Sequence, residues 1–458
     1  MKKKIYIETY GCQMNFSDSE IVASILQDSG YASTNDAGQA DVILLNTCSV
    51  RDNAEKKVRN RLSQFHALKR SNPGLVLGVL GCMAERIKTK LLEDEQLLDM
   101  VVGPDAYRDL PGLIKRAENG RSAVNVVLSS EETYADICPV RLHNNVSAFI
   151  SITRGCDNMC AFCVVPFTRG RERSRNPETI AVEAAALFEK GCREITLLGQ
   201  NVDSYLWFGG GPKIQFAQRA KGTAVVNFAE LLEMVAETDP KLWVRFSTSH
   251  PKDLTDEVLR VMAKHDNICK HIHLPIQSGN DEILIKMKRG YTVGWYMSRI
   301  EAIQTIVPDC AISTDIIAGF CGETEEQHRD TLRIMEAVKY YTAYMFMYSD
   351  RPGTLANRQM TDDVPVEVKK KRLKEIIALQ QQHSTTRNEE AMNKEHRVLV
   401  EDVSKRSDEH YFGRNSQNTV FVFPKRNAKV GDFVHITPHS CTAATIIGDH
   451  AEKNVMYQ

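Results

Sequence analysis

Long apolar runs, net charge and low-complexity segments are all scarce in this 458-residue sequence. No apolar run reaches the ~18 residues that suggest a membrane span. The chain opens with Met1-Lys2-Lys3-Lys4 and a short strand-like run, without the hydrophobic segment of a secretory signal. The formal net charge is −1, so any nucleic-acid-binding surface has to be local. These absences predict a cytoplasmic protein with no membrane association.

The length exceeds what one ordinary core accommodates and predicts several domains. In residues 1–130, short apolar runs alternate with amphipathic stretches, which predicts an open parallel α/β domain. Residues 142–376 contain six strand-like runs separated by helical stretches, as in a partial (β/α)6 barrel with its site at the carboxyl ends of the strands. Within this part, residues 206–222 are rich in Gly and Lys/Arg and resemble an insertion loop.

A long polar helix is expected over 365–396, and the last domain over 380–451. There, four short alternating runs predict a small antiparallel β-barrel: 397–403, 419–423, 433–437 and 445–447. The expected strands of the first domain are 5–9, 42–46, 76–80 and 100–102. Those of the central barrel are 149–153, 194–199, 243–248, 271–276, 311–318 and 342–348.

Three of the twelve cysteines form a tight motif, Cys156-x3-Cys160-x2-Cys163, just past the first barrel strand. In a reducing compartment such cysteines indicate metal ligation or catalysis more than disulfides. A cubane iron–sulfur cluster normally takes four thiolates, one per iron, so three cysteines leave one iron open to chelate S-adenosylmethionine. One electron from the cluster can then break a sulfur–carbon bond and give a 5′-deoxyadenosyl radical. The alternative is a zinc site, but zinc loops usually carry a second cysteine pair, and none is present.

Three further cysteines lie far apart in the sequence but in equivalent places. Cys12, Cys48 and Cys82 follow the runs IYIETYG, VILLNT and LVLGVLG, each of which ends a predicted parallel strand. Because the carboxyl ends of parallel strands meet at one edge of a sheet, we expect these thiols to converge on a second cluster with three protein ligands. The alternative is that they are small buried apolar residues, as free cysteines often are.

The three-cysteine motif and the barrel resemble the radical S-adenosylmethionine superfamily. The resemblance implies that polar groups at the ends of the barrel strands hold the cofactor, although each of them could also be an ordinary turn residue. The implied cofactor contacts are Gln200, Asn201, Ser247, Ser249, Gln277, Asp315 and Gly319.

Two stretches, TYGCQMNFSDSE and TRGCDNMCAFCVVPFTRGRERSR, make the chain resemble the methylthiotransferase family over nearly its whole length. The likeness is to the bacterial branch that converts isopentenyl-adenosine at position 37 of tRNA into its 2-methylthio derivative. It implies an N-terminal methylthiotransferase domain, a radical barrel and a C-terminal TRAM RNA-binding domain, whose usual turn the sequence GRNSQN at 413–418 fits only loosely. The implied cofactors and partners are two [4Fe–4S] clusters, S-adenosylmethionine as methyl donor and radical source, tRNA containing isopentenyl-adenosine, and a flavodoxin- or ferredoxin-type electron donor.

Four arginines follow the cluster motif within seven residues: Arg169, Arg171, Arg173 and Arg175. Guanidinium groups at the rim of a site suit phosphate contacts, which predicts RNA binding there. The alternatives are a solvated loop with local ion pairs, or contact with the carboxylate of the cofactor. The basic run at 369–374 is a weaker candidate, because a basic helix face is often simply solvated.

Two other classes of function remain open at this point. One is a methylthiotransferase that acts on a ribosomal protein side chain or on another modified tRNA adenosine. The other is a non-enzymatic RNA-binding protein with structural iron–sulfur clusters, which would produce no 5′-deoxyadenosine.

Overall fold

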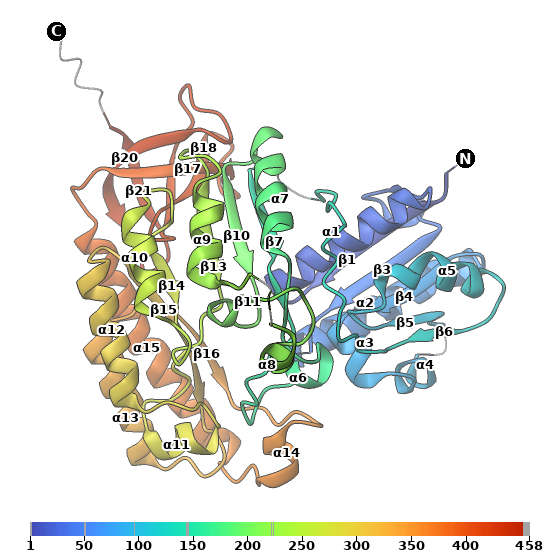
Figure 1. Ribbon diagram of the computed structural model, residues 1–458, viewed down its shortest axis with the longest axis horizontal. Coiled ribbons are helices and arrows are strands. Elements are labelled where there is room, and N and C mark those ends of the chain that lie inside the picture. The colour runs from blue at the N-terminus through green and yellow to red at the C-terminus, as the bar shows by residue number, and fades with distance from the viewer. Residues whose placement is uncertain are drawn as a thin grey trace.

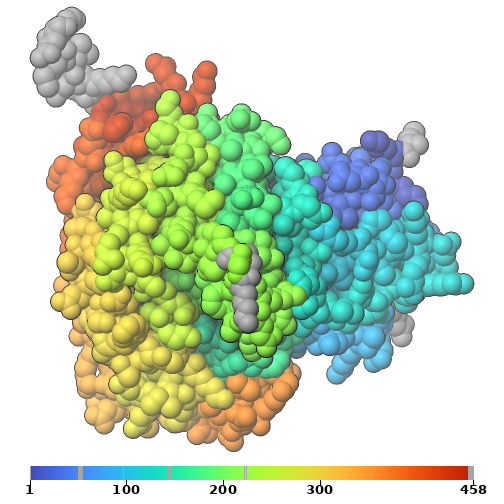
Figure 2. Space-filling model, viewed as in Figure 1, coloured from blue at the N-terminus to red at the C-terminus, as the bar shows by residue number. Residues whose placement is uncertain are grey.

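The computed structural model describes residues 2–49, 52–95, 97–142, 146–220, 222 and 224–451. A parallel sheet covered by helices is followed by a half-open barrel and a small closed barrel, in chain order (Figure 1). Figure 2 shows the first part as a lobe that protrudes beside the central barrel. This arrangement confirms the predicted fold class. In the described part of the chain, no helix combines the length and apolar character needed to cross a membrane.

The N-terminal sheet has six parallel strands in the order β2-β1-β3-β4-β5-β6. The strands are β1 (Lys4–Tyr10), β2 (Ala32–Ser33), β3 (Val42–Thr47), β4 (Val76–Leu80), β5 (Met100–Val102) and β6 (Ala123–Asn125). Four of them were expected; β2 and β6, which were not, have only two and three residues. The helices are α1 (Gln13–Asp28), α2 (Asp52–Ser71), α3 (Cys82–Ile87), α4 (Lys90–Asp94) and α5 (Leu110–Glu118).

Strand β3 explains why this sheet is covered on both faces. Successive side chains of a strand point to opposite faces, and here both faces are apolar. Val42 and Leu44 belong to the core under α1 and α5, whereas Ile43 and Leu45 belong to the core that contains residues of α2 and α4. The continuous apolar run is typical of a parallel strand buried between two helical layers.

The central barrel is an arc of six parallel strands with helices outside. The strands are β7 (Ser147–Ser151), β10 (Glu194–Leu198), β13 (Trp243–Ser247), β14 (His271–His273), β15 (Ala311–Ala318) and β16 (Thr342–Met347). The helices around them include α7 (Pro177–Glu189), α9 (Phe228–Ala236), α10 (Asp256–Lys264), α11 (Asp281–Lys286), α12 (Val293–Ile306) and α13 (Glu325–Val338). The strands form two three-stranded sheets, which meet where the Cys269 amide donates to the Val244 carbonyl at 2.9 Å.

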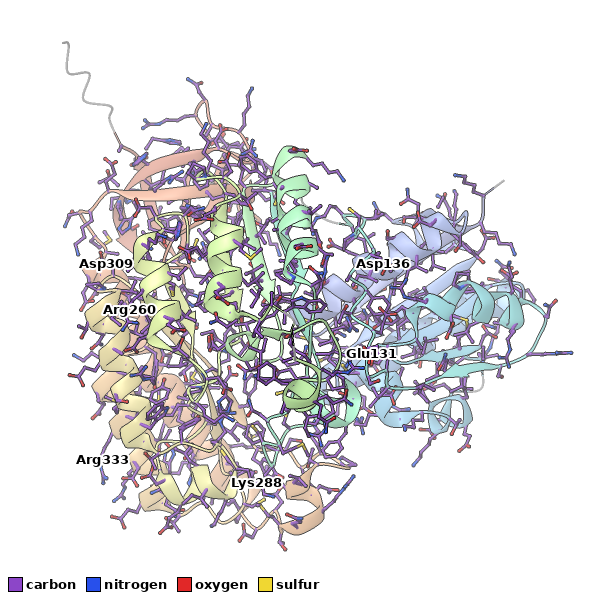
Figure 3. All side chains as sticks on the ribbon, in the orientation of Figure 1. Glu131, Asp136, Arg260, Lys288, Asp309 and Arg333 are labelled. Atoms are coloured by element: carbon purple, nitrogen blue, oxygen red, sulfur yellow. The ribbon has the colours of Figure 1, made fainter. Side chains whose placement is uncertain are left out.

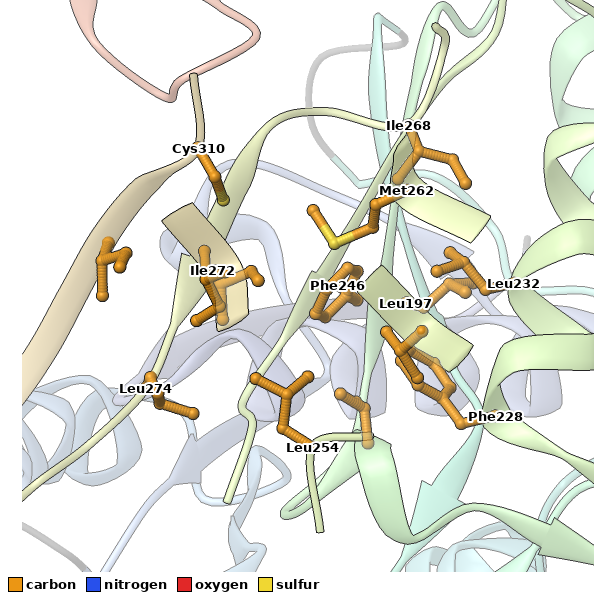
Figure 4. Packing of buried hydrophobic residues seen from close by; sticks show 14 of the residues in the cluster. Leu197, Phe228, Leu232, Phe246, Leu254, Met262, Ile268, Ile272, Leu274 and Cys310 are labelled. Atoms are coloured by element: carbon orange, nitrogen blue, oxygen red, sulfur yellow. The ribbon is translucent and has the colours of Figure 1, made fainter. Parts of the chain in front are cut away.

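Alternate strand residues divide the barrel into an apolar outer layer and a polar lumen. Leu197 and Phe246 pack against Phe228 and Leu232 of α9 in the core shown in Figure 4. The alternating positions are polar and pair with each other across neighbouring strands: the Arg245 side chain donates to Glu194 at 2.7 Å, and His271 and His273 both contact Ser313. A polar lumen suits a site that binds charged ligands rather than a structural core.

The predicted insertion at 206–222 is a folded flap at the side of the barrel. It contains β11 (Leu206–Trp207) and α8 (Phe216–Arg219), and β11 pairs with β12 (Val226–Asn227). Arg219 forms an ion pair at 3.2 Å with Glu131, which lies in the connection to the N-terminal domain (Figure 3). Lys213 forms another at 3.3 Å with buried Glu172. The insertion therefore joins the barrel to the connection.

Helix α15 (Val366–Glu390) leads to a closed C-terminal barrel of five strands in the order β17-β18-β19-β21-β20. The strands are β17 (His396–Val403), β18 (His410–Asn415), β19 (Val420–Pro424), β20 (Phe433–Cys441) and β21 (Ile446–His450). Strand β18 was not expected, so 413–415 are strand and only 416–418 lie in the turn region. Arg414 extends from β18 to Glu194 at 2.7 Å, which fixes the small barrel to the floor of the large one.

Candidate functional site

The scattered cysteines Cys12, Cys48 and Cys82 follow β1, β3 and β4, three neighbouring strands of the parallel sheet. The register pairs Tyr10 with Thr47 and Asn46 with Leu80, so the three strands end at nearly the same level. Cys12 is exposed, whereas Cys48 and Cys82 are buried. The topology therefore brings the three thiols to one edge of the sheet, as the strand pattern predicted.

Gly11 allows two of these strand ends to approach each other. Its φ of +122° is rarely adopted by residues with a side chain, and an added Cβ would lie 2.7 Å from both Cβ and Sγ of Cys48. Below it, buried Asn46 donates to the Asn15 carbonyl and the Ser19 hydroxyl, both at 2.9 Å. The close contact and the side-chain network together position Cys12 beside Cys48.

The second trio lies on one loop, 155–172, between the short paired strands β8 (Thr153–Arg154) and β9 (Arg173–Ser174). The Cys156 amide donates to the Gly170 carbonyl at 3.2 Å, and the Cys163 amide to the Cys160 carbonyl at 3.0 Å. The amide of Val165 donates to the Cys163 sulfur at 3.4 Å. Local backbone hydrogen bonds therefore fold this loop around its own three thiols.

The two trios border a common region. Helix α3, which begins at Cys82, packs against α6 (Val165–Thr168), which follows Cys163. Desolvation raises the pKa of the Cys163 thiol to about 12; the Cys160 thiol adds to the shift, Arg289 opposes it, and the Cys82 thiol contributes in the same direction as Cys160. The electrostatic influence of Cys82 on Cys163 agrees with the packing of α3 against α6, which brings the two trios near each other.

The donor chemistry of both trios fits cubane clusters better than single metal ions. Among the described residues, neither trio gathers three ligand atoms within 4.8 Å of one another; the one group that does is Glu233, Glu237 and His265 on the barrel surface. A zinc ion needs its ligands around one centre, whereas each thiolate of a cubane binds a different iron. All six cysteines are free, and N–H groups already point at three of the sulfurs.

Polar atoms without partners gather at the ends of β10 and β13. Both side-chain amide atoms of Gln200 are buried without a hydrogen bond, as are Oδ1 of Asn201 and Oγ of Ser249. Ser247 contacts the neighbouring Thr248 hydroxyl at 3.2 Å. Because buried polar groups are normally paired, these atoms are suited to a polar ligand bound beside the cluster loop.

The other expected cofactor contacts have partners within the chain. Gln277 and Asp315 are linked through the backbone, where the Gln277 amide donates to the Asp315 carbonyl at 2.9 Å, and the Asp315 carboxylate lies 3.4 Å from His273 Nε2. Gly319 lies under Lys369 of α15, and an added Cβ would be 2.4 Å from Lys369 Cγ. In this conformation the space above Gly319 is occupied by Lys369.

Three of the four arginines after the cluster loop are buried in ion pairs, which corrects their expected place at an RNA-facing rim. Arg169 pairs with Asp18 at 2.6 Å, and Arg173 and Arg175 pair with Asp105 and Glu183. These guanidinium groups are at most 7% exposed, but that of Arg171 is 56% exposed and 3.5 Å from Asp157. Only Arg171 is free to reach a phosphate without rearrangement. The basic run of α15 is likewise partly internal, since Lys369 and Arg372 are buried.

Three acidic and basic residues of the site were missed in the sequence. Asp18 is fully buried and accepts from Arg154 and Arg169; burial alone would raise its pKa, but the two guanidinium groups lower it below the ordinary value. Arg289 donates to the Cys160 sulfur at 3.2 Å. Burial raises the pKa of Asp203 to about 8. No local motif marks these residues, because their partners come from distant segments.

Comparison with protein families divides the chain as the fold does. Residues 4–103 match Uncharacterized protein family UPF0004, residues 150–335 match the Radical SAM superfamily, and residues 392–445 match the TRAM domain.

Solved structures share the fold at low sequence identity. The radical S-adenosylmethionine methyltransferase TsrM from Kitasatospora setae, with cobalamin and a [4Fe–4S] cluster bound, gives a TM-score of 0.56 at 13% identity. The match covers 78% of this chain and 77% of that chain. The same enzyme with tryptophan and an S-adenosylmethionine analogue gives a TM-score of 0.54 at 12% identity, covering 75% and 72%.

Sequence relatives are much closer and cover nearly the whole chain. A protein of Christiangramia forsetii is 57% identical over 98% of this chain and 94% of its own length, and one of Flavobacterium johnsoniae is 58% identical with the same coverage. A third, from Bacteroides fragilis, is 52% identical over 98% of this chain and 95% of its own length. All three are named tRNA-2-methylthio-N(6)-dimethylallyladenosine synthase. The chain belongs to the family of the tRNA-2-methylthio-N(6)-dimethylallyladenosine synthases.

Proposed function

We propose that this protein attaches a methylthio group to carbon 2 of isopentenyl-adenosine at position 37 of tRNA. The reaction uses two S-adenosylmethionine molecules, one as methyl donor and one as radical source. The observation that carries the proposal is the meeting of two cysteine trios, one from the sheet edge and one from the barrel loop, at a shared boundary. The names of the relatives support the choice of substrate.

Each trio has a separate task in this proposal. Cys156, Cys160 and Cys163 would hold the cluster whose open iron binds S-adenosylmethionine, and this cluster would supply one electron to it. Cys12, Cys48 and Cys82 would hold the auxiliary cluster, which would serve the methylthio transfer. Helices α3 and α6 pack against each other, which supports two neighbouring sites.

The chain's own polar groups orient the cofactor. The unpaired atoms of Gln200, Asn201 and Ser249 are suited to the charged methionine end of S-adenosylmethionine. Asn201 is itself held by Asp253, to which its side-chain amide donates at 2.6 Å. A held amide loses less rotamer freedom when it binds a ligand. Ser247, Gln277, Asp315 and Gly319 remain candidates for the rest of the cofactor.

RNA binding is assigned to the exposed guanidinium of Arg171 and to the TRAM barrel. Arg171 is part of the cluster loop and lines an open groove of about 380 Å³ together with Phe167 and Met159. A positive side chain beside apolar groups suits a phosphate with its neighbouring base. We also propose that a flavodoxin- or ferredoxin-type protein donates the electron that reduces the cluster. We place the protein in the cytoplasm, where tRNA is modified.

The test is nucleoside analysis of tRNA from a strain that lacks the gene and from the same strain complemented with the wild-type chain or with Cys12→Ala. We expect the 2-methylthio nucleoside to disappear, to return with the wild-type chain and to stay absent with Cys12→Ala, while isopentenyl-adenosine accumulates. Unchanged tRNA nucleosides together with a lost modification on a ribosomal protein would contradict the proposal and assign the protein substrate instead.

A further inference from the structure

Each cysteine trio receives a hydrogen bond from one buried arginine. Arg169 donates through Nε to the Cys82 sulfur at 3.2 Å, and Arg289 donates through Nη1 to the Cys160 sulfur at 3.2 Å. Arg169 is 3% exposed and Arg289 is 5% exposed. The two contacts have the same length and chemistry, although the arginines belong to different segments of the chain.

Arg289 has no acidic partner among the described residues. Its other hydrogen bonds go to neutral acceptors, the Tyr291 hydroxyl at 3.0 Å and the Pro275 carbonyl at 2.9 Å. An uncompensated guanidinium in the interior is strongly unfavourable. The charge of Arg289 therefore calls for a negative group at the position to which it points, which is the cluster loop.

Arg169 belongs to a buried network that also carries one excess positive charge. Asp18 pairs with Arg169 and Arg154, and Asp105 pairs with Arg154 and Arg173. Three guanidinium groups thus face two carboxylates, all of them nearly inaccessible to solvent. Within this network, Nη1 of Arg169 has no hydrogen-bond partner. The spare charge and the spare donor both lie beside Cys82.

One negative charge per trio is what a cubane cluster provides. A doubly positive iron–sulfur core held by three thiolates carries one net negative charge, and one-electron reduction adds a second. A fixed positive charge and a hydrogen bond to a ligand sulfur stabilise the reduced cluster more than the oxidised one, which raises its reduction potential.

We propose that Arg169 and Arg289 are a matched pair of positioning residues, each of which holds one ligand sulfur and raises the reduction potential of its own cluster. The inference rests on the cluster ligands given under the proposed function. It assigns Arg169 to the auxiliary cluster instead of to RNA. The charge around the auxiliary cluster is then determined by the buried ion pairs between Asp18 and Asp105 of the N-terminal domain and the arginines of the barrel.

The test is a potentiometric titration of full-length chains that retain one cluster each, with dithionite as the one-electron reductant and electron paramagnetic resonance as the readout. Arg289→Gln is placed in the background in which Cys12, Cys48 and Cys82 are alanine. Arg169→Gln is placed in the background in which Cys156, Cys160 and Cys163 are alanine. We expect each substitution to lower the ratio of reduced to oxidised cluster at fixed potential at least tenfold, which is a midpoint shift of 59 mV for one electron.

Three comparisons make the result specific. Arg289→Lys and Arg169→Lys keep the charge and should restore most of the midpoint. Exchanging the backgrounds should abolish the effect, because each arginine contacts one trio only. Arg260→Gln, which removes an exposed guanidinium group on α10, should leave both midpoints unchanged.

Outcomes separate this inference from the proposed function. Retention of about four iron atoms per chain with an unmoved midpoint in the glutamine variants would overturn the inference. If a glutamine variant loses its iron, the lysine variant decides: a full shift despite the retained charge overturns the inference, and an unmoved midpoint supports it. Absence of iron from the unsubstituted single-trio backgrounds would instead overturn the ligand assignment, and with it the proposed function.

Discussion

The two cysteine trios are brought together by different parts of the fold. Cys156, Cys160 and Cys163 share one loop, and hydrogen bonds within that loop position them. Cys12, Cys48 and Cys82 stand on three strands, so their positions depend on the strand register, on the close approach at Gly11 and on the ion network of Asp18. The positions of Cys156, Cys160 and Cys163 (the barrel trio) therefore depend on one loop. Those of Cys12, Cys48 and Cys82 (the sheet trio) depend on the correct folding of both the N-terminal domain and the barrel.

The largest expected effect separates the trios by their metal content. Replacement of Cys156, Cys160 and Cys163 by alanine should reduce iron and sulfide from about eight of each per reconstituted chain to about four, because each cubane holds four of each. Replacement of Cys12, Cys48 and Cys82 should do the same. Iron and sulfide analysis after anaerobic reconstitution measures this; a triple variant that retains all its iron would rule out the assignment for that trio.

The substitution Asp18→Asn should lower the free energy of unfolding by about 3 kcal/mol. It removes the carboxylate that pairs with the buried guanidinium groups of Arg154 and Arg169. The measurement is denaturant unfolding of the cluster-free protein, with Asp136→Asn as the control. Asp136 lies on the surface (Figure 3) and pairs with exposed Arg108, so its substitution should change the free energy of unfolding by less than about 1 kcal/mol.

The stability difference between the wild-type chain and Asp18→Asn should depend on pH. The native pKa of Asp18 lies below its ordinary value of 3.8, so its contribution is complete above that pH and is lost as the pH falls through the native pKa. The stability gap between the wild-type chain and Asp18→Asn should therefore narrow below about pH 4. Equal stabilities of Asp18→Asn and Asp136→Asn at neutral pH would contradict a structural role of the network.

Gly11→Ala should affect the sheet trio without affecting the barrel trio. The new methyl group would lie 2.7 Å from Cys48 atoms in a backbone conformation that alanine disfavours, at a cost of about 1–3 kcal/mol. We expect reconstituted iron to fall toward about four atoms per chain. Gly30→Ala is the matched control, since Gly30 has a φ of +93° but nothing within 4 Å of an added Cβ. An equal loss of iron in both variants would mean that backbone strain, and not the contact with Cys48, causes the loss.

The smallest expected effect concerns the one exposed arginine beside the barrel trio. Arg171→Ala should weaken tRNA binding and reduce the slope of log affinity against log salt by about one unit, because one phosphate contact is lost. The control is Arg260→Ala on the outer surface of α10 (Figure 3), for which no change is expected. Identical salt slopes for the two variants would remove Arg171 from the RNA-binding surface.

Strands and cysteine positions could be predicted from the sequence because they follow from periodic burial. Short apolar runs marked the parallel strands of both α/β parts, and the carboxyl ends of the N-terminal strands located Cys12, Cys48 and Cys82. Strand β18 was missed because its residues are only partly apolar; it fits into the closed barrel at Gly413, where an added Cβ would lie 1.9 Å from the Leu399 carbonyl oxygen. That contact depends on tertiary structure.

The role of the arginines could not be predicted for the same reason. Four guanidinium groups in seven residues are typical of a solvent-facing anion site, and the sequence around them does not show that acids from other segments bury three of them. Asp18 lies 151 residues from Arg169 in the sequence, and Asp105 lies 68 residues from Arg173. Arg289 is equally hidden, since its sulfur partner Cys160 is 129 residues away.

The division of labour between the trios is tested most directly by counting both products of one reaction. Each variant is incubated with S-adenosylmethionine, a reductant and tRNA containing isopentenyl-adenosine, and mass spectrometry measures 5′-deoxyadenosine and the 2-methylthio nucleoside. We expect that Cys12→Ala still forms 5′-deoxyadenosine but no methylthio nucleoside, and that Cys160→Ala forms neither. Equal loss of 5′-deoxyadenosine in the two variants would contradict the assignment of separate roles to the two trios.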